Sequence, residues 1–323
     1  MLEEHSLGLI TATLLSCVVF FFGFAVNLSN LALLYTSSHF LPNFLREGVA
    51  NATSDYMLPI SPANWSVAVW GVVYVCQWLW LVYALTSLCR QTHAGPAYNN
   101  PKLLPVQVHF FFCLAILEQV GWLVLVDRQY LTFALLLLAL STACSLLSLG
   151  MSYYTFDSAL PILQQENRRF DIWAIRLCAH NSMAFLAVWL TLYMAFNFSL
   201  VLAFEVDTPV ALSTSAIVEL SCVAFLIFCY TLADLTIFDK FSRYVLLPYV
   251  AFVVFLASQI FNLEPSAHDP VFLMLSVMQA LSFLLLLLKV IVSAWRHVAR
   301  SNSEKRMVTV RPLAQDEQSY LLP

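Results

Sequence analysis

Eight apolar runs, each of about 20 residues or more, divide this chain and restrict its fold more than any other feature. About 20 apolar helical residues are needed to cross the hydrocarbon of a bilayer. Backbone amides cannot stay unpaired in hydrocarbon, so each run is expected to be a helix. The sequence therefore predicts an all-α polytopic membrane bundle over residues 1–295, with about eight transmembrane helices at 8–35, 64–88, 104–126, 130–154, 177–203, 209–236, 244–263 and 270–294.

The amino-acid composition supports a membrane bundle and argues against a soluble enzyme. Of the 323 residues, 61% are hydrophobic and 11% are charged, whereas an average globular chain carries about 25% charged residues. The first segment, MLEEHS, has no basic region, so the first run is expected to be a retained span. No nucleophile elbow, zinc-protease helix, phosphate loop or CxxC pair occurs. The sequence therefore predicts no enzyme, cofactor, metal site or nucleic-acid partner.

The loops between the runs alternate in charge, and this alternation predicts the orientation. Only Arg46 and Arg128 fall in one set of loops, and the acidic residues of that set outnumber them. The other thirteen basic residues lie at or near the opposite ends of the runs or in the tail: Arg90, Lys102, Arg168, Arg169, Arg176, Lys240, Arg243, Lys289, Arg296, Arg300, Lys305, Arg306 and Arg311. Basic loops face the cytosol. Both termini are therefore predicted to be cytosolic (N-in/C-in).

Two short motifs predict how the chain is processed and sorted. Asn51 begins an Asn-Ala-Thr sequon in the longest non-cytosolic loop and is the predicted glycosylation acceptor. The polar tail, residues 296–323, is expected to be disordered and ends in DEQSYLLP. There Glu317, Leu321 and Leu322 match an acidic dileucine signal for cytosolic adaptor complexes, although so short a pattern also arises by chance. The signal would place the protein in the endosome, the lysosome or the plasma membrane.

Two carboxyl groups lie inside predicted spans, where ionisable residues are costly and are functional candidates. Glu118 and Glu219 are expected at matched depth, roughly 12–15 Å below the non-cytosolic surface. They are candidates for proton coupling if they meet. The alternative is that each is hydrogen-bonded to a neighbouring helix with a structural role. His109 and His180 lie near the cytosolic ends of their spans and are expected to join helices through hydrogen bonds.

An aromatic stretch, SPANWSVAVWGVVY at residues 61–74, opens the second run. Trp65 lies at the membrane surface, where tryptophan is enriched as an interface anchor. Trp70, Tyr74 and Trp78 recur at helical spacing and share one helix face with Gln77. A flat aromatic wall suits a flat apolar ligand. The stretch therefore predicts either a ligand-binding wall or a set of interface anchors.

This stretch resembles the second-span signature of the TspO/translocator-protein family, in which a Pro-Ala pair precedes two tryptophans, a glycine and a tyrosine. The segments GWLVLVDRQY (121–130), IWAIRLCAHNSMAFLAVWLTLYMAFN (172–197) and FDKFSRYVLLPYV (238–250) are also similar to the family. The resemblance implies a helical bundle that binds porphyrin, sterol or similar apolar molecules. It also implies that Trp65, Trp70 and Tyr74 line or close the pocket, with Trp189 as a further candidate.

Three functions therefore stay open at the level of sequence. The first is a TspO-like protein that binds, and in one version transports, a small apolar or planar ligand. The second is a proton-coupled solute transporter of an acidic organelle that uses Glu118 and Glu219. The third is a non-catalytic membrane scaffold whose loops and tail recruit partners. A homo-oligomer is compatible with all three, and the sequon and tail fit poorly with a mitochondrial outer-membrane location.

Overall fold

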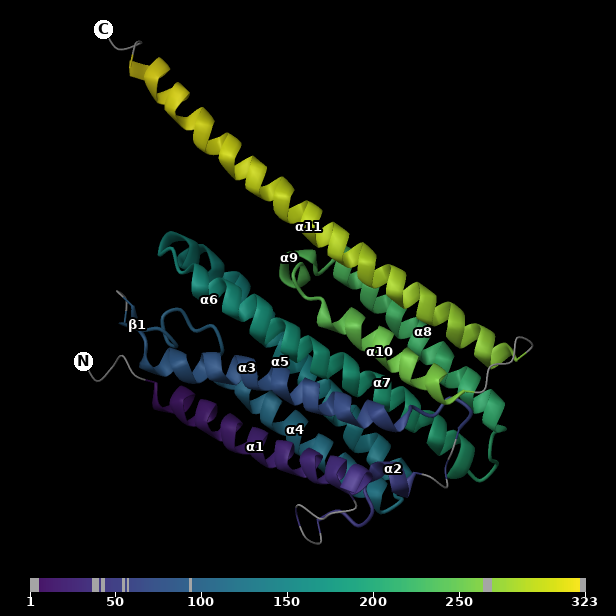
Figure 1. Ribbon diagram of the computed structural model, residues 1–323. Coiled ribbons are helices and arrows are strands. Elements are labelled where there is room, and N and C mark those ends of the chain that lie inside the picture. The colour runs from purple at the N-terminus through teal and green to yellow at the C-terminus, as the bar shows by residue number, and fades with distance from the viewer. Residues whose placement is uncertain are drawn as a thin grey trace.

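The apolar runs of the sequence form helices in the computed structural model. It describes residues 6–36, 41, 44–53, 56, 58–92, 95–263 and 269–319, without side chains from residue 300 onward. In that part of the chain, seven helical segments are long and apolar enough to cross a membrane (Figure 1). This confirms the all-α polytopic bundle. The segments are Leu7–Thr36 (α1), Asn64–Cys89 (η2, Asn64–Ala68, and α3, Val69–Cys89), Val106–Asp127 (α4), Leu131–Gln165 (α5), Arg169–Phe204, Leu212–Thr236 (α8) and Pro270–Ala299 of α11 (Pro270–Ser319).

The remaining elements are short or interrupt a long helix. Arg169–Phe204 consists of α6 (Arg169–Ala174), a π-helical turn η3 (Ile175–His180) and α7 (Asn181–Phe204). One antiparallel pair, β1 (Gln91–Thr92) and β2 (Gly95–Pro96), lies after α3. Single turns form α2 (Val49–Ala52) and α9 (Asp239–Ser242).

The eighth predicted span, 244–263, is a shorter helix, α10 (Leu247–Asn262). Its 16 residues rise about 24 Å, less than the ~30 Å of bilayer hydrocarbon. At one end the Asn181 side-chain oxygen accepts the Leu246 N–H at 2.8 Å. At the other end Asn262 donates to the Ser61 carbonyl at 3.2 Å. Since α10 reverses the chain once more, the start of α1 and the end of α11 lie at the same end of the bundle (Figure 1), as an even number of crossings requires.

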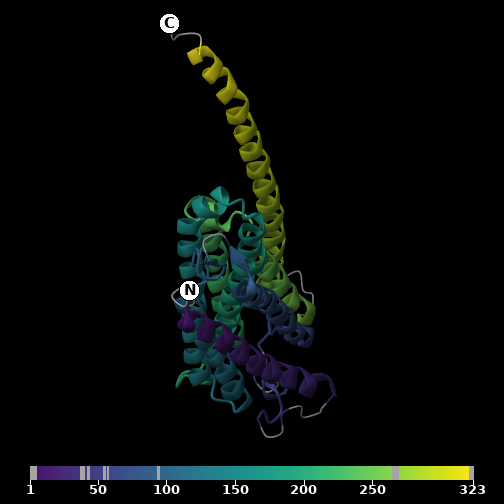
Figure 2. The same cartoon turned by 90° about the vertical axis from the view of Figure 1, so that its left-hand side faces the viewer.

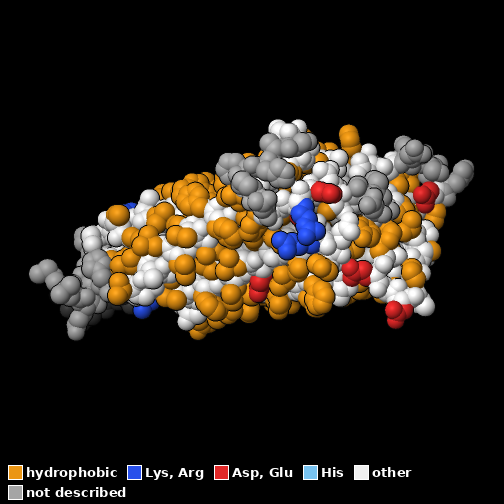
Figure 3. Space-filling view, turned by 90° about the horizontal axis from the view of Figure 1, so that it is seen from below, with side chains coloured by type: hydrophobic (Ala, Val, Ile, Leu, Met, Phe, Trp, Pro, Cys, Tyr) orange, Lys and Arg blue, Asp and Glu red, His pale blue; other side chains and the backbone are white. Residues whose placement is uncertain are grey.

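Helix α7 lies inside the bundle, and α11 lies at its edge. In the most apolar stretch of Arg169–Phe204, 61% of the residues are buried, compared with 22% in α11. The helices α3, α5, α8 and α10 all pack against α7. Large apolar side chains such as Phe133, Phe225 and Leu284 are at least 60% exposed, and hydrophobic side chains dominate the face in Figure 3. An outer surface of this kind is suited to lipid rather than water.

The helices α4 and α5 pack against each other through small residues. Ser141, Ser145, Ser148 and Ser152 recur at intervals of three and four on α5, and all four are buried. Ser141 donates to the Ala115 carbonyl at 2.7 Å, and Ser148 donates to the Val108 carbonyl at 2.9 Å. Small side chains let the two backbones approach, and the hydroxyls of Ser141 and Ser148 bond across the interface because hydrocarbon offers no other partner.

Ion pairs organise the end of the bundle where α1 begins, which we call the basic end. Asp171 accepts hydrogen bonds from Tyr83, Arg90 and Arg168. Nearby, Asp239 pairs with Arg243 and Arg296. Burial raises the pKa of Asp239, but the hydrogen bonds and positive charges of the two arginines outweigh burial and hold this pKa below its usual value.

Carboxylates cap the backbone at the other end of the bundle, which we call the opposite end. Asp127 accepts N–H groups from three consecutive residues, Arg46, Glu47 and Gly48, at 2.7–3.0 Å. Glu205 accepts the N–H groups of Leu131 and Thr132, the first residues of α5. A carboxylate is favourable at a helix N-terminus because it satisfies free donors and meets the positive end of the helix dipole.

The C-terminal segment differs from the sequence expectation. Helix α11 continues to Ser319 and extends past the bundle (Figure 2), whereas disorder was expected from residue 296. Residues 296–319 are rich in helix-favouring Lys, Arg, Glu, Gln and Ala, and they include one proline, Pro312. Of the dileucine residues, Glu317 lies on this helix without a described side chain, and Leu321 and Leu322 lie outside the described residues.

Close helix packing at Gly23 gives a first testable prediction. A Cβ at Gly23 would lie 2.6 Å from Ile116 and 2.8 Å from the Tyr74 hydroxyl, whereas a Cβ at Gly71 meets nothing within 4 Å. We expect Gly23→Ala to lower the free energy of unfolding by about 1–3 kcal/mol through overpacking. The matched Gly71→Ala variant should be neutral or more stable by up to about 1 kcal/mol. Unfolding in mixed micelles measures both, and equal effects would contradict the packing argument.

Candidate functional site

The first part of the aromatic stretch, residues 61–68, forms a turn that is hydrogen-bonded to α10. We call it the 61–68 turn. Pro62 has no N–H to leave unpaired, and the next N–H, of Ala63, donates to the Ser258 carbonyl at 3.0 Å. Asn262 holds the Ser61 carbonyl one residue before the proline. The chain then enters η2 and continues into α3. The entrance of α3 is therefore positioned by α10, which follows it by almost two hundred residues.

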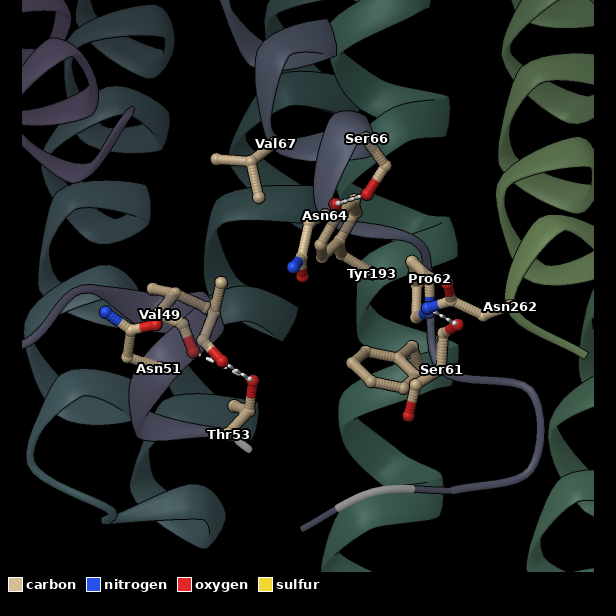
Figure 4. A pocket seen from close by; sticks show the side chains of 12 residues that line it. Val49, Asn51, Thr53, Ser61, Pro62, Asn64, Ser66, Val67, Tyr193 and Asn262 are labelled. Carbon is tan, nitrogen blue, oxygen red and sulfur yellow. Dashed lines mark hydrogen bonds between the residues drawn. The ribbon is translucent and has the colours of Figure 1, made fainter. Parts of the chain in front are cut away.

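A cavity of about 260 Å³ lies at the opposite end of the bundle, between this turn, α2 and α7 (Figure 4). Polar groups from Asn64 and Asn262 flank it, and Ser66 and Tyr193 meet in its wall with their hydroxyl oxygens 3.3 Å apart. Its lining residues are Val49, Ala50, Asn51, Thr53, Ser61, Pro62, Asn64, Ser66, Val67, Tyr193, Phe196 and Asn262.

Tyr193 connects the cavity to a buried aromatic cluster, which consists of Trp70, Trp122, Trp189, Tyr193 and Phe255. The ring centroids of the other four lie 5.4–5.8 Å from that of Tyr193. The rings come from α3, α4, α7 and α10. All five are at most 6% exposed. Tilted and edge-to-face contacts at these distances stabilise beyond apolar burial alone. Tyr193 lines the cavity, and the other four rings pack behind it as an aromatic floor.

The structure separates the predicted aromatic stripe into two environments. Trp70 joins the aromatic cluster. Tyr74 instead faces α1 and α4, where its hydroxyl donates to Gln119 at 2.9 Å and accepts from Asn27 at 2.8 Å. Trp78 packs on Phe20 and Phe21 of α1. The three side chains do not form one wall, because Tyr74 and Trp78 pack against Phe20 of α1, whereas Trp70 packs against Trp122 and Trp189.

The other tryptophans named from the sequence also have defined places. Trp189 is completely buried in the aromatic cluster. Trp65 is 36% exposed at the mouth of α3 and is absent from the lining residues of the cavity, so its position fits an interface anchor. Sequence reasoning assigned no role to Tyr193, Trp122 or Phe255. Tyr193 could have been found, since it follows Trp189 by four residues and shares its helix face.

The two predicted proton-coupling carboxyls do not meet. Glu118 lies on the α5 side of α4, with the Cys144 thiol 3.8 Å away. Glu219 is completely buried and accepts hydrogen bonds from Ser199 of α7 at 2.8 Å and Gln259 of α10 at 2.5 Å. The sequence predicted the depth of the two carboxyls in the membrane, but not the direction in which each points from its helix. In the structure the two carboxyls point to different neighbouring helices.

A buried ion pair near the basic end was missed from the sequence. In the sequence, the basic residues nearest to Asp234 are Lys240 and Arg243, not Lys289. In the structure, the Lys289 and Asp234 side chains are each 2% exposed and 2.7 Å apart, with the Tyr249 hydroxyl donating to the same oxygen of Asp234. The sequence gave no indication of this ion pair, because its two residues lie 55 positions apart, on α8 and α11.

The two buried histidines join helices or pack among rings. His109 of α4 lies 3.0 Å from the Ser16 hydroxyl of α1. His180 lies at the end of η3 against Tyr153 and Phe156. Among the residues that the structure describes, no group of three His, Cys, Asp or Glu side chains could hold a metal ion.

Asn51, the predicted glycosylation acceptor, lies on α2 with its side chain exposed. Its neighbourhood also forms part of the cavity wall. Glycosylation needs an acceptor at the surface, and any sugar attached to Asn51 would stand at the rim of the cavity.

Comparison with known proteins gives no match: no family model, curated protein or solved structure is similar to this chain.

Proposed function

We propose that this multi-pass membrane protein binds a small planar molecule with one polar group in the cavity between the 61–68 turn and Tyr193. The observation that carries the proposal is the combination of a 260 Å³ cavity with a preformed aromatic floor. Ligand sites are mostly apolar concavities with a few well-placed polar groups. Here Tyr193 and Phe196 supply the apolar surface, and Asn64, Ser66 and Asn262 supply the polar groups.

The size of the cavity limits the ligand class. Sites that enclose drug-sized ligands measure roughly 300–1,000 Å³, and this cavity is slightly smaller. A compound of one or two rings fits inside. A porphyrin, a sterol or another lipid-like molecule would insert one edge and leave the rest at the membrane surface. Of the ligands implied by the TspO resemblance, the cavity therefore favours the smaller planar ones.

We also propose kinship with the TspO family, on the ground of the motif SPANWSVAVWGVVY at this turn. The positive-inside rule favours a cytosolic location for the basic end, and the cavity would then open to the lumen or the cell exterior. The tail would present its dileucine signal to cytosolic adaptors, which favours the endosome, the lysosome or the plasma membrane.

Transport and scaffolding are the alternative functions. The separation of Glu118 from Glu219 weakens the version of transport in which the two carboxyls share a proton.

A matched pair of variants tests the cavity. Val67 lines it, whereas Ala68 is exposed and is absent from its lining. The probe is para-bromophenol, which has one ring, one hydroxyl and a bromine that quenches tryptophan fluorescence on close approach. We expect saturable quenching in the wild type and at least a tenfold loss of affinity in Val67→Phe, because the new ring fills the cavity, a loss of about 1.4 kcal/mol. Ala68→Phe should bind as the wild type does.

Equal affinity in the two variants would contradict the proposed site. Linear quenching without saturation in the wild type would mean that the probe only partitions into the surrounding detergent or lipid, and it would also contradict the site. Thermal unfolding of each variant shows whether the bundle is intact.

A further inference from the structure

We propose that Glu219 is a proton-binding site behind the wall of the cavity, neutral in the arrangement seen here, and that loss of its proton loosens the contact of α7 with α10. The inference deepens the proposed function, because it makes ligand binding depend on protons. The argument depends on hydrogen-bond geometry, on burial and on the position of this side chain.

The first step is a count of the protons around the carboxyl. The Ser199 hydroxyl has one proton but two acceptors in reach, the Phe196 carbonyl at 2.7 Å and a Glu219 oxygen at 2.8 Å. A hydroxyl can donate only once. Both contacts are satisfied if Glu219 carries the proton and donates it to Ser199, which then donates to Phe196. An ionised Glu219 would leave one of the two acceptors without a donor.

The surroundings of the carboxyl are also short of donors. The other oxygen of Glu219 accepts from the Gln259 amide, and the amide oxygen of Gln259 is itself buried without a partner among the described residues. The residue is 0% exposed. A buried carboxylate needs a nearby cation or several donors to balance its lost hydration, and here two neutral side chains reach it.

Charged and titratable groups on the neighbouring helices do not provide that balance. On α8 and α11, Asp234 and Lys289 pair with each other, and Asp234 lies 15 residues from Glu219, about 22 Å along the helix. On α10, Tyr249 bonds to Asp234. On α7, Tyr193 bonds to Ser66. The remaining groups of α8 with a titratable proton are Tyr230, which packs against Tyr249, and the exposed thiols Cys222 and Cys229.

The position of Glu219 connects the proton to the cavity. Its partner Ser199 donates to the carbonyl of Phe196, a lining residue on α7. Its other partner, Gln259, lies next to Ser258, whose carbonyl holds the 61–68 turn, and three residues before Asn262, which also lines the cavity. The neutral acid therefore joins the two helices that carry Phe196 and Asn262. An ionised acid would draw in water, and the cavity lined by Phe196 and Asn262 is a described space that could supply it.

Infrared spectroscopy of the purified protein tests the proton directly. Glutamine at residue 219 can donate to Ser199 and accept from Gln259 as the neutral acid does, so Glu219→Gln is expected to fold. We expect a deuterium-sensitive carbonyl band of a protonated carboxylic acid at neutral pH that is lost in Glu219→Gln. The matched variant Glu118→Gln should keep this component. A spectrum that Glu219→Gln leaves unchanged would overturn the proposal.

Hydrogen exchange tests the mechanical consequence without any ligand. Raising the pH should increase exchange of the α10 amides at residues 255–262 in the wild type relative to Glu219→Gln measured at the same pH, because only the wild type can lose the proton. Equal exchange in the two proteins at every pH would refute the coupling. Exchange near the Asp234–Lys289 pair serves as the internal reference.

Ligand binding separates this inference from the proposed function. With para-bromophenol as the probe, affinity in the wild type should fall about tenfold for each pH unit above the ionisation of Glu219, as linkage to one proton requires. Affinity in Glu219→Gln should not change over that range. If the probe fails to bind the wild type at any pH, the proposed ligand site fails, whereas the infrared and exchange results still decide the proton site.

Discussion

Replacing Lys289 by methionine should lower the free energy of unfolding by about 3–5 kcal/mol, because it leaves the carboxylate of Asp234 buried without its cation. Both side chains are 2% exposed and their charged atoms are 2.7 Å apart. One carboxylate oxygen of Asp234 already has no partner among the described residues, so the remaining Tyr249 hydroxyl cannot replace the lysine. Unfolding in mixed micelles, followed by tryptophan fluorescence, measures the loss.

Two further variants make this prediction specific. The Lys240–Asp157 pair has almost the same length, 2.8 Å, but its side chains are 60% and 44% exposed. Lys240→Met should therefore cost less than about 1 kcal/mol. The double variant Asp234→Asn with Lys289→Met removes both charges and should recover much of the stability lost in Lys289→Met. A single variant at Lys289 that is as stable as the one at Lys240 would disprove a structural role for the pair.

Replacing Trp189 by alanine should lower the free energy of unfolding by about 3–5 kcal/mol, the usual cost of removing a fully buried tryptophan. Its ring contacts Trp70, Phe185, Tyr193 and Phe255, so the substitution opens a cavity where three helices meet. Trp295→Ala, at a residue that is 68% exposed, is the matched control and should change the stability by less than about 0.5 kcal/mol.

Trp189→Phe refines the second prediction. The Trp189 ring nitrogen has no hydrogen-bond partner among the described residues, so phenylalanine loses volume but no polar contact and should cost less than alanine. A cost of Trp189→Ala no larger than that of Trp295→Ala would show that the aromatic cluster does not hold α7 in place. Since Tyr193 belongs to the same cluster, Trp189→Ala should also weaken binding of para-bromophenol if the floor of the cavity matters.

The sequence alone was sufficient for the architecture. Long apolar runs can only be helices in hydrocarbon, and this reason does not depend on tertiary contacts. The count of eight also followed from the sequence, through the alternation of basic residues between loops. The structure changed it in one respect: the run 244–263 forms the 16-residue helix α10, since Asn181 captures its start and Asn262 binds back to the 61–68 turn.

The candidate site was predicted only in part. Trp70 and Trp189 were selected from the sequence, and they do meet in the aromatic cluster. Tyr74 and Trp78 were selected by the same helical spacing and face α1 instead. In a bundle with almost uniformly apolar helices, spacing shows which residues share a face, but hydrophobicity does not show which neighbour that face meets. Tyr193 shares the helix face of Trp189 and could have been selected by spacing, but its contacts with Trp70 and Trp122 could not.

Local sequence therefore determined which segments are helices, how they cross and which end is basic, because hydrogen bonding in hydrocarbon and loop charge depend on segments one at a time. Tertiary structure decided which buried polar groups are partners. Lys289 meets Asp234 and Glu219 meets Ser199 and Gln259, whereas Glu118 and Glu219 stay apart. These pairings depend on the rotation of each helix about its axis, which is fixed by the packing of several helices together and leaves no signal in any single one.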